Sequence, residues 1–234
     1  SEQPGRQWWI IAICLLVGGL VGFGLSLLFP PVYEAAFKVT SNVQLTDNPE
    51  ITEIMVDNAL MHVGELAYLQ PLLDRVIEAE KSQGIRLTPA DLRKSSSVER
   101  QITTTYLKVR WTDAQTAAQI ANTWGMLFYD SLQQGAKQSV IADELKQTSE
   151  VLQNCLAGIQ TPSLSIPECN RSKVELETEL ASIAGRIADA ESLSLGLYHG
   201  LTVNGYEKAT IPDHPVRQER GWLIAAGAGI GLVA

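Results

Sequence analysis

An uncharged stretch near the start of the chain constrains the fold more than any other feature. Trp8 to Phe29 contains no Asp, Glu, Lys or Arg, and about 20 apolar residues suffice to cross the hydrocarbon core of a bilayer. A backbone in lipid must satisfy its own hydrogen bonds, so this stretch is expected to be a transmembrane helix. Pro30 and Pro31 follow it, where a cleaved signal peptide would have small residues. We therefore interpret the stretch as a retained anchor.

A second uncharged stretch, Gly221 to Ala234, ends the sequence. It is shorter than a bilayer span, and we interpret it as a second transmembrane helix that the sequence cuts short. Residues 1–7 are then cytoplasmic, and 30–220 form one extracytoplasmic domain between the helices 8–29 and 221–234. Both stretches contain small residues at the spacing that lets helices pack closely in lipid, namely Gly18, Gly22, Gly227 and Gly231.

The composition excludes several classes of function. The formal net charge is −8, and Lys and Arg are scattered among acidic residues, so no nucleic-acid partner is expected. The sequence contains no phosphate-binding loop and no nucleophile-elbow motif. The three histidines, His62, His199 and His214, lack the spacing of metal ligands. We expect no catalytic residue, no metal and no cofactor.

Two of the three cysteines flank a proline-containing segment. Cys155 and Cys169 lie on either side of Pro162 and Pro167, and in an oxidising compartment such a pair forms a disulfide that closes a hairpin. Two unpaired thiols are the alternative, and we favour the disulfide. Cys14 lies within the first apolar stretch and is interpreted as a small apolar residue.

Between its apolar ends the sequence predicts an α+β fold. Alternating, β-prone residues predict strands at 32–40 and 98–112 and a returning strand at 201–211. Helix-start signals near Pro49, Pro71 and Thr88 predict three helices after the first strand. In the second predicted strand one parity is the more apolar and is expected to face the core: Thr103, Thr105, Leu107, Val109 and Trp111.

A long helix and its partner carry the strongest periodicity. Asp113 is expected to cap a helix in which positions from Ala117 to Cys155 recur at alternating spacings of three and four. This stripe is apolar at both ends and polar in its middle, where three residues suit a wet lumen or an interface between protomers: Ser131, Gln134 and Gln138. A helix from Ser172 to Tyr198 repeats the heptad stripe with Leu176, Leu180, Ile183, Ile187, Ala190, Ser194 and Leu197.

These two helices, joined by the proline-containing segment, predict a long antiparallel hairpin. We expect the hairpin over 126–197 to project from a membrane-proximal α/β base formed by 30–125 and 198–216. Trp124, Phe128 and Tyr129 have the composition of a ligand cage, but their helical spacing favours a core where the long helix meets the sheet. Glu191 and the other acids of the second helix are interpreted as solvating an exposed face.

Three groups of residues, in this order, complete the pattern. Pro30, Pro31 and Tyr33 follow the first apolar stretch; Asp113, Ala117, Ile120, Ala121 and Asn122 mark the passage from strand to long helix; Ala209, Pro212 and Pro215 precede the second apolar stretch. Together they resemble the membrane-boundary motifs and the strand–helix block of the Wzz-type chain-length determinants, also called polysaccharide co-polymerases. Ala114 stands where that family usually has proline.

The resemblance implies a non-enzymatic scaffold of the bacterial inner membrane with a periplasmic central domain. It implies a ring-shaped homo-oligomer that helps set the chain length or export of a surface polysaccharide, such as lipopolysaccharide O-antigen, capsule or exopolysaccharide. The implied partners are a membrane polysaccharide polymerase, polysaccharide or lipid-linked glycan, and the lipid bilayer. Two other classes share part of the pattern. One is the ligand-sensing domain of a two-helix membrane receptor, and the other is a periplasmic pump adaptor, which usually lacks a second membrane helix.

Overall fold

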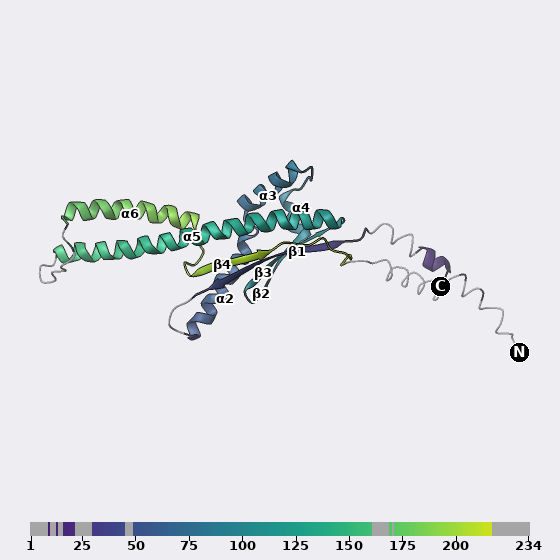
Figure 1. Ribbon diagram of the computed structural model, residues 1–234, viewed down its shortest axis with the longest axis horizontal. Coiled ribbons are helices and arrows are strands. Elements are labelled where there is room, and N and C mark those ends of the chain that lie inside the picture. Colours follow the sequence, from purple (N-terminus) through teal and green to yellow (C-terminus); the bar gives the residue numbers. More distant parts are fainter. Residues whose placement is uncertain are drawn as a thin grey trace. The chain divides into compact units, whose positions relative to one another are not determined.

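The structure is a computed structural model that describes residues 9, 13, 16–21, 30–44, 49–160, 169 and 171–216. Its main elements, in chain order, are β1 (Tyr33–Val43), α2 (Pro49–Leu66), α3 (Gln70–Ser82), α4 (Pro89–Ser95), β2 (Ser96–Gln101), β3 (Thr104–Trp111), α5 (Ala114–Gln160), α6 (Lys173–Leu193) and β4 (Leu201–Glu207) (Figure 1). The predicted α+β class, with a small antiparallel sheet and a very long helix, is confirmed.

The two apolar stretches fall largely outside the described residues. Within the described part of the chain, no helix combines the length and the apolar character that crossing a membrane requires. Gly22, Gly227 and Gly231 lie outside the described residues, and Gly18 is half-buried. Both transmembrane helices therefore stay a prediction.

The sheet has four strands in the order β2-β3-β1-β4. β1 and β4 pair antiparallel, from Lys38 opposite Glu207 to Val43 opposite Leu201. The Nζ atom of Lys38 lies 3.0 Å from the carboxylate of Glu207, so the register also aligns an opposite-charge pair across the two strands. The predicted returning strand thus pairs with the strand that follows the first apolar stretch, and it ends at Glu207 rather than near residue 211.

The prediction of a single strand over 98–112 is wrong. The chain turns at Ile102, whose φ is 54°, and a link this short between β2 and β3 permits only antiparallel pairing. The turn contains no Gly, Asn or Pro that would predict it, and the alternating pattern of side chains continues across it without a break. The predicted core-facing parity is confirmed in β3, where Thr105, Leu107 and Val109 are buried; Thr103 and Trp111 are half-buried.

The chain divides into two compact units: unit one is 1–36, 108–121 and 209–234, and unit two is 37–107 and 122–208. In unit one the N–H of Val216 donates to the carbonyl oxygen of Val32 at 2.8 Å. The Nε of Arg110 also donates to the Glu34 carboxylate at 2.7 Å. The expected division into a base and a hairpin beginning at residue 126 stays a prediction.

The core of unit two forms along one face of α5. Trp124, Phe128 and Leu132 recur at a spacing of four, and all three are fully buried. The Trp124 indole N–H donates to the carbonyl oxygen of Ala67 at 2.9 Å, which satisfies the one polar group of that side chain. The interpretation of Trp124 and Phe128 as core is confirmed. Tyr129 is half-buried, and its ring lies 4.8 Å from that of Tyr206.

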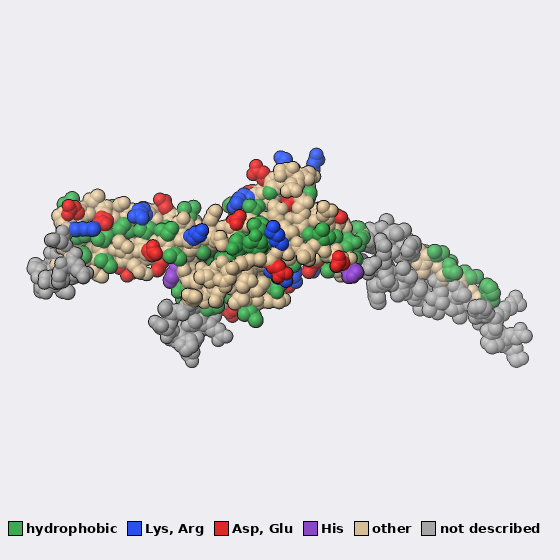
Figure 2. Space-filling model, viewed as in Figure 1, with side chains coloured by type: hydrophobic (Ala, Val, Ile, Leu, Met, Phe, Trp, Pro, Cys, Tyr) green, Lys and Arg blue, Asp and Glu red, His purple; other side chains and the backbone are tan. Residues whose placement is uncertain are grey.

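The second half of α5 and α6 form the predicted antiparallel hairpin (Figure 1). Figure 2 shows hydrophobic side chains in a band along it, flanked by acidic and basic side chains. All seven predicted stripe residues of the second helix are buried or half-buried. The helix itself is shorter than predicted: it ends at Leu193, because Leu195 and Gly196 take φ values of 58° and 69° and turn the chain.

The predicted stripe of α5 is correct at its ends and displaced in its middle. Between residues 127 and 142 the buried side chains are Phe128, Leu132, Ser139 and Ala142 rather than those at 127, 131, 138 and 141. In this stretch the interior face is therefore one residue further along than the predicted stripe. The middle of the stripe is polar because Ser131, Gln134 and Gln138 lie beside that face rather than on it.

Acidic pH is expected to weaken the start of α5. The Asp113 carboxylate accepts hydrogen bonds from the N–H and the hydroxyl of Thr116, each at 2.7 Å, and these bonds lower the pKa of Asp113. A depressed folded-state pKa gives stability that is present above the ordinary value and is lost as pH falls through the folded value. Asp113→Ala should reduce the stability lost on acidification, measured by urea unfolding of the protein in mild detergent at neutral pH and at about pH 3.

Asp113→Asn is the matched control, because an amide oxygen still caps the helix but carries no titrating charge. It should keep most of the stability at neutral pH and show the same shallow pH dependence as the alanine variant. If the wild type and both variants lose equal stability on acidification, the carboxylate does not act as this cap.

Candidate functional site

A polar cavity of about 550 Å³ lies in unit two. Its walls are α2, α5, the end of α6 and the segment that leads into β4. Ser139, Asp143 and Lys146 line it from one face of α5, because residues four and seven apart share a helix face. His62 comes from α2, Glu191 from α6, and Tyr198 and His199 from the segment before β4.

A close approach of the chain to α5 builds one wall of this cavity. A side chain at Gly135 would place its Cβ 2.9 Å from Leu197 and 3.0 Å from the carbonyl oxygen of Ser194. Glycine therefore lets the segment 194–197 lie close against the helix here without a shift of its neighbours. The hydroxyl of Ser139 donates to Ala136 O at 2.8 Å and lies 3.4 Å from Tyr198 O, so the same wall is also tied by hydrogen bonding.

Charged groups face one another across the cavity. Lys146 Nζ lies 2.6 Å from Glu191 Oε1, and the hydrogen bond and charge of Glu191 raise the pKa of Lys146. His199 Nδ1 lies 3.7 Å from Asp143 Oδ1, which is beyond hydrogen-bond distance. His62 Nε2 lies 3.0 Å from the carbonyl oxygen of Leu195, so its ring joins α2 to the turn after α6.

This arrangement suits binding better than covalent chemistry. Its hydroxyl, carboxylate, ammonium and imidazole groups offer both donors and acceptors at the wall of one hollow. The described residues include no group of three or more His, Cys, Asp or Glu side chains placed to hold a metal ion. Cavities of this size with a few convergent polar groups are typical of small-ligand sites.

Two of the three residues predicted for a lumen or an interface meet in a second, smaller hollow of about 240 Å³. Ser131 and Gln134 line it together with apolar residues of α3 and of the end of α6. The Arg75 guanidinium donates to the Ser131 hydroxyl at 3.4 Å. Gln134 is exposed, while Gln138 is half-buried and is not among the residues that line this hollow. Their role at a lumen or an interface stays a prediction.

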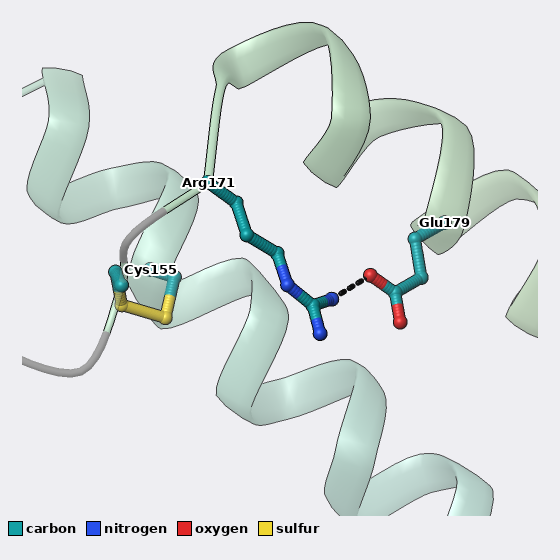
Figure 3. The surroundings of a disulfide bond; sticks show 4 residues. Cys155, Arg171 and Glu179 are labelled. Carbon is teal, nitrogen blue, oxygen red and sulfur yellow. Dashed lines mark hydrogen bonds and ion pairs between the residues drawn. A yellow bond between two sulfur atoms is a disulfide. The ribbon is translucent and has the colours of Figure 1, made fainter.

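The far end of the hairpin carries the cysteine pair. The structure joins Cys155 to Cys169 in a disulfide with a Cα–Cα distance of 5.5 Å. Next to it Arg171 forms an ion pair with Glu179 of α6 (Figure 3). Cys155 also packs in a cluster with Leu145, Leu152, Leu176 and Ile183, so the disulfide extends the apolar contact between the two helices.

The motifs predicted to lie at membrane boundaries are joined through their backbones in unit one. Pro30, Pro31 and Tyr33 lead into β1, and Ala209, Pro212 and Pro215 follow β4. The hydrogen bond from Val216 to Val32 therefore joins the first group to the last. In the strand–helix block Asp113 caps α5 and three residues are fully buried, Ala117, Ile120 and Ala121; Asn122, the first residue of α5 in unit two, is half-buried.

Sequence reasoning missed the polar cavity. Their spacing excludes His62 and His199 as metal ligands, Glu191 is interpreted as a solvated acid, and the sequence does not predict that the three share a site. Asp143 and Lys146 share a face of α5, but nothing in their spacing distinguishes them from a solvated helix surface. Only the fold brings the contributing segments together, so no local signal could have identified the site.

The described elements define an α+β protein with a long antiparallel helical hairpin. No protein-family model and no curated protein matches the sequence. Among solved structures, the chain is similar to a full-length bacterial polysaccharide co-polymerase, with a TM-score of 0.40 and 12% identity over 99% of this chain and 93% of that one. It is also similar to a mutant of the Shigella flexneri lipopolysaccharide O-antigen chain-length regulator WzzBSF, with a TM-score of 0.19 and 14% identity over 79% of this chain and 99% of that one.

Proposed function

We propose that the protein is a non-enzymatic membrane scaffold that regulates the chain length or export of a bacterial surface polysaccharide. The observation that carries this proposal is the hydrogen bond between Val216 and Val32 in unit one. It places side by side the two segments that lead into the apolar stretches 8–29 and 221–234. If two neighbouring transmembrane helices hold the domain, the segments that connect the domain to them must lie side by side. The order of the three motifs and the long hairpin between them support the same assignment.

The scaffold acts as a homo-oligomer. In the sheet formed by the described strands, β2 and β4 are the outer members, and outer strands carry backbone groups that a neighbouring protomer can pair with. A contact of this head-to-tail kind repeats around an axis and gives a ring when its rotation closes after a whole number of protomers. Ser131, Gln134 and Gln138 then face the lumen of the ring or the interface between protomers.

The partners follow from this arrangement. The central domain lies in the periplasm of a bacterial cell, anchored in the inner membrane. The ring holds a membrane polysaccharide polymerase, and polysaccharide or lipid-linked glycan passes beside it. Chain length is then set by geometry, without a catalytic residue, metal or cofactor on this chain.

Deletion of the gene tests the function directly. The surface glycans of the deletion strain, separated on a gel, should change in modal length or in amount, and the full chain supplied in trans should restore the original pattern. An unchanged length distribution and an unchanged amount would contradict the proposal. The ring is tested separately, by measuring the mass of the purified protein in nanodiscs. A mass of several protomers is expected, and a monomer would contradict the ring.

A ligand-sensing domain of a two-helix membrane receptor is the second candidate. The cavity of about 550 Å³ in unit two favours it, because a sensor needs a defined pocket. The deletion strain separates the two candidates. A sensor predicts unaltered glycan lengths together with the loss of a ligand-dependent change in gene expression.

A further inference from the structure

We propose that the polar cavity between α2, α5 and the segment 194–199 binds a short stretch of a neutral sugar chain. This inference rests on the proposed function, which makes a glycan the partner of the protein. It adds the place where the glycan is held and the groups that hold it. Three properties of the cavity support it, namely its charge, its hydrogen-bonding groups and its shape. All the residues concerned belong to unit two.

The charges of the cavity oppose an anionic ligand. Lys146 is the one lysine of the lining and is already paired with Glu191. Asp143 adds a second carboxylate to the same wall. A phosphate or a carboxylated ligand would meet two negative groups and compete with Glu191 for the ammonium group. A purely apolar ligand would leave these polar groups desolvated and unpaired.

The spacing of the polar pairs suits a hydroxyl group. His199 Nδ1 and Asp143 Oδ1 are 3.7 Å apart, a separation at which a third group can bridge two polar atoms. A sugar hydroxyl donates one hydrogen bond and accepts others, so it can donate to the carboxylate and accept from the imidazole or from Lys146. Neighbouring hydroxyls of a sugar ring can bind the His199–Asp143 pair and the Lys146–Glu191 pair at the same time.

The lining supplies two aromatic rings, inclined to each other by 41°, and a wall held by hydrogen bonds. The rings of Tyr198 and His199 lie adjacent, with centroids 4.2 Å apart, and both line the cavity. Such rings pack against the apolar C–H face of a sugar while their polar atoms remain available. The wall is held by hydrogen bonds within the chain, because Ser194 donates to Glu191 O at 2.8 Å and accepts from the Gly196 N–H at 3.3 Å. Less conformational freedom is then lost on binding.

Ligand titration of the full chain in nanodiscs tests the assignment. The probes are neutral oligosaccharides released from the surface polysaccharide of the producing cells, oligosaccharides of glucosamine, and inorganic phosphate. Isothermal titration calorimetry should detect binding of the neutral probe alone. Asp143→Ala and Tyr198→Ala should each weaken its binding at least about tenfold, which corresponds to about 1.4 kcal/mol. Preferential binding of phosphate or of the amino sugar would overturn the assignment.

Asp189→Ala is the matched control, because Asp189 is an exposed aspartate of α6 that is absent from the cavity lining. It should bind the neutral probe as the wild type does, and thermal unfolding should show that all three variants are folded. Equal affinities of the Asp143 variant and this control would refute the site. The same oligosaccharide joined to its lipid carrier should bind no more tightly than the free form, since binding of the lipid-linked form alone would mean that the cavity does not recognise sugar.

Failure of this inference and failure of the proposed function give different results in cells. If the function is right and the site is wrong, deletion changes the glycan lengths but the Asp143→Ala chain restores the original pattern. If the function is wrong, deletion leaves the glycans unchanged whatever the titration shows. If both are right, the Asp143→Ala chain leaves the glycan pattern altered and the Asp189→Ala chain restores it.

Discussion

Gly125→Val is expected to destabilise unit two strongly. A Cβ at position 125 would lie 2.1 Å from Cγ of Phe37 and 2.2 and 2.6 Å from two further atoms of the ring, distances that no packing tolerates. Phe37 is fully buried in β1, and the Tyr206 ring stacks on it with centroids 5.4 Å apart, so the ring has no room to withdraw. Overpacking of a core costs about 1–3 kcal/mol and occasionally more, and domains are stable by only about 5–15 kcal/mol.

Gly125→Ala makes the test sharper, because two effects oppose each other. Alanine is favoured over glycine in a helix by about 1 kcal/mol, so a position without a steric constraint should gain stability. Gly185 of α6 is such a position, because a Cβ added there would meet nothing within 4 Å. Thermal unfolding followed by circular dichroism should show Gly185→Ala at or above the wild type and Gly125→Ala clearly below it. Equal stabilities of the two variants would mean that α5 does not lie this close to β1.

The two hairpin helices differ in how far their packing could be predicted. The predicted stripe from Leu176 to Leu197 is correct, because α6 packs against the second half of α5. α5 passes first against β1, where Gly125 faces the Phe37 ring, and later packs against α6 through Leu145 and Leu152. A helix that changes partner shifts its interior face, and no fixed heptad follows that shift. The predicted stripe was therefore wrong between the two contacts.

Turns and the candidate site were the other features that limited prediction from the sequence. Ile102 adopts a left-handed conformation without glycine or asparagine, so the β2–β3 turn gave no compositional signal. The helix starts at Thr88 and Asp113 did give such a signal, and both carry the expected side-chain caps. The polar cavity depends on His62, Asp143, Glu191 and His199, which come from separate segments. Side chains brought together by tertiary packing alone leave no pattern in the sequence.

The disulfide is a site feature that the local sequence does predict. Its removal should strongly lower the local stability of the hairpin end. The bond closes a loop with a sequence separation of 14, and constraint of a loop of this size is worth about 3 kcal/mol. In Cys155→Ala/Cys169→Ala the end of the hairpin should open more often. Amide hydrogen exchange in 145–156 and 173–183 should accelerate on the order of 100-fold, as that loss of local stability implies.

Reduction separates the disulfide from the packing of Cys155. A reductant should accelerate exchange at the hairpin end of the wild type and leave the double variant unchanged, because only the wild type has a bond to break. Amides of β3 (Thr104–Trp111) serve as the internal control, since they belong to the sheet and should exchange alike in all samples. A non-reducing peptide map of the purified protein should contain the peptide that links Cys155 to Cys169. Two free thiols in that map would refute the bond, and the apolar cluster around Leu152 and Leu176 would then have to hold the end of the hairpin unaided.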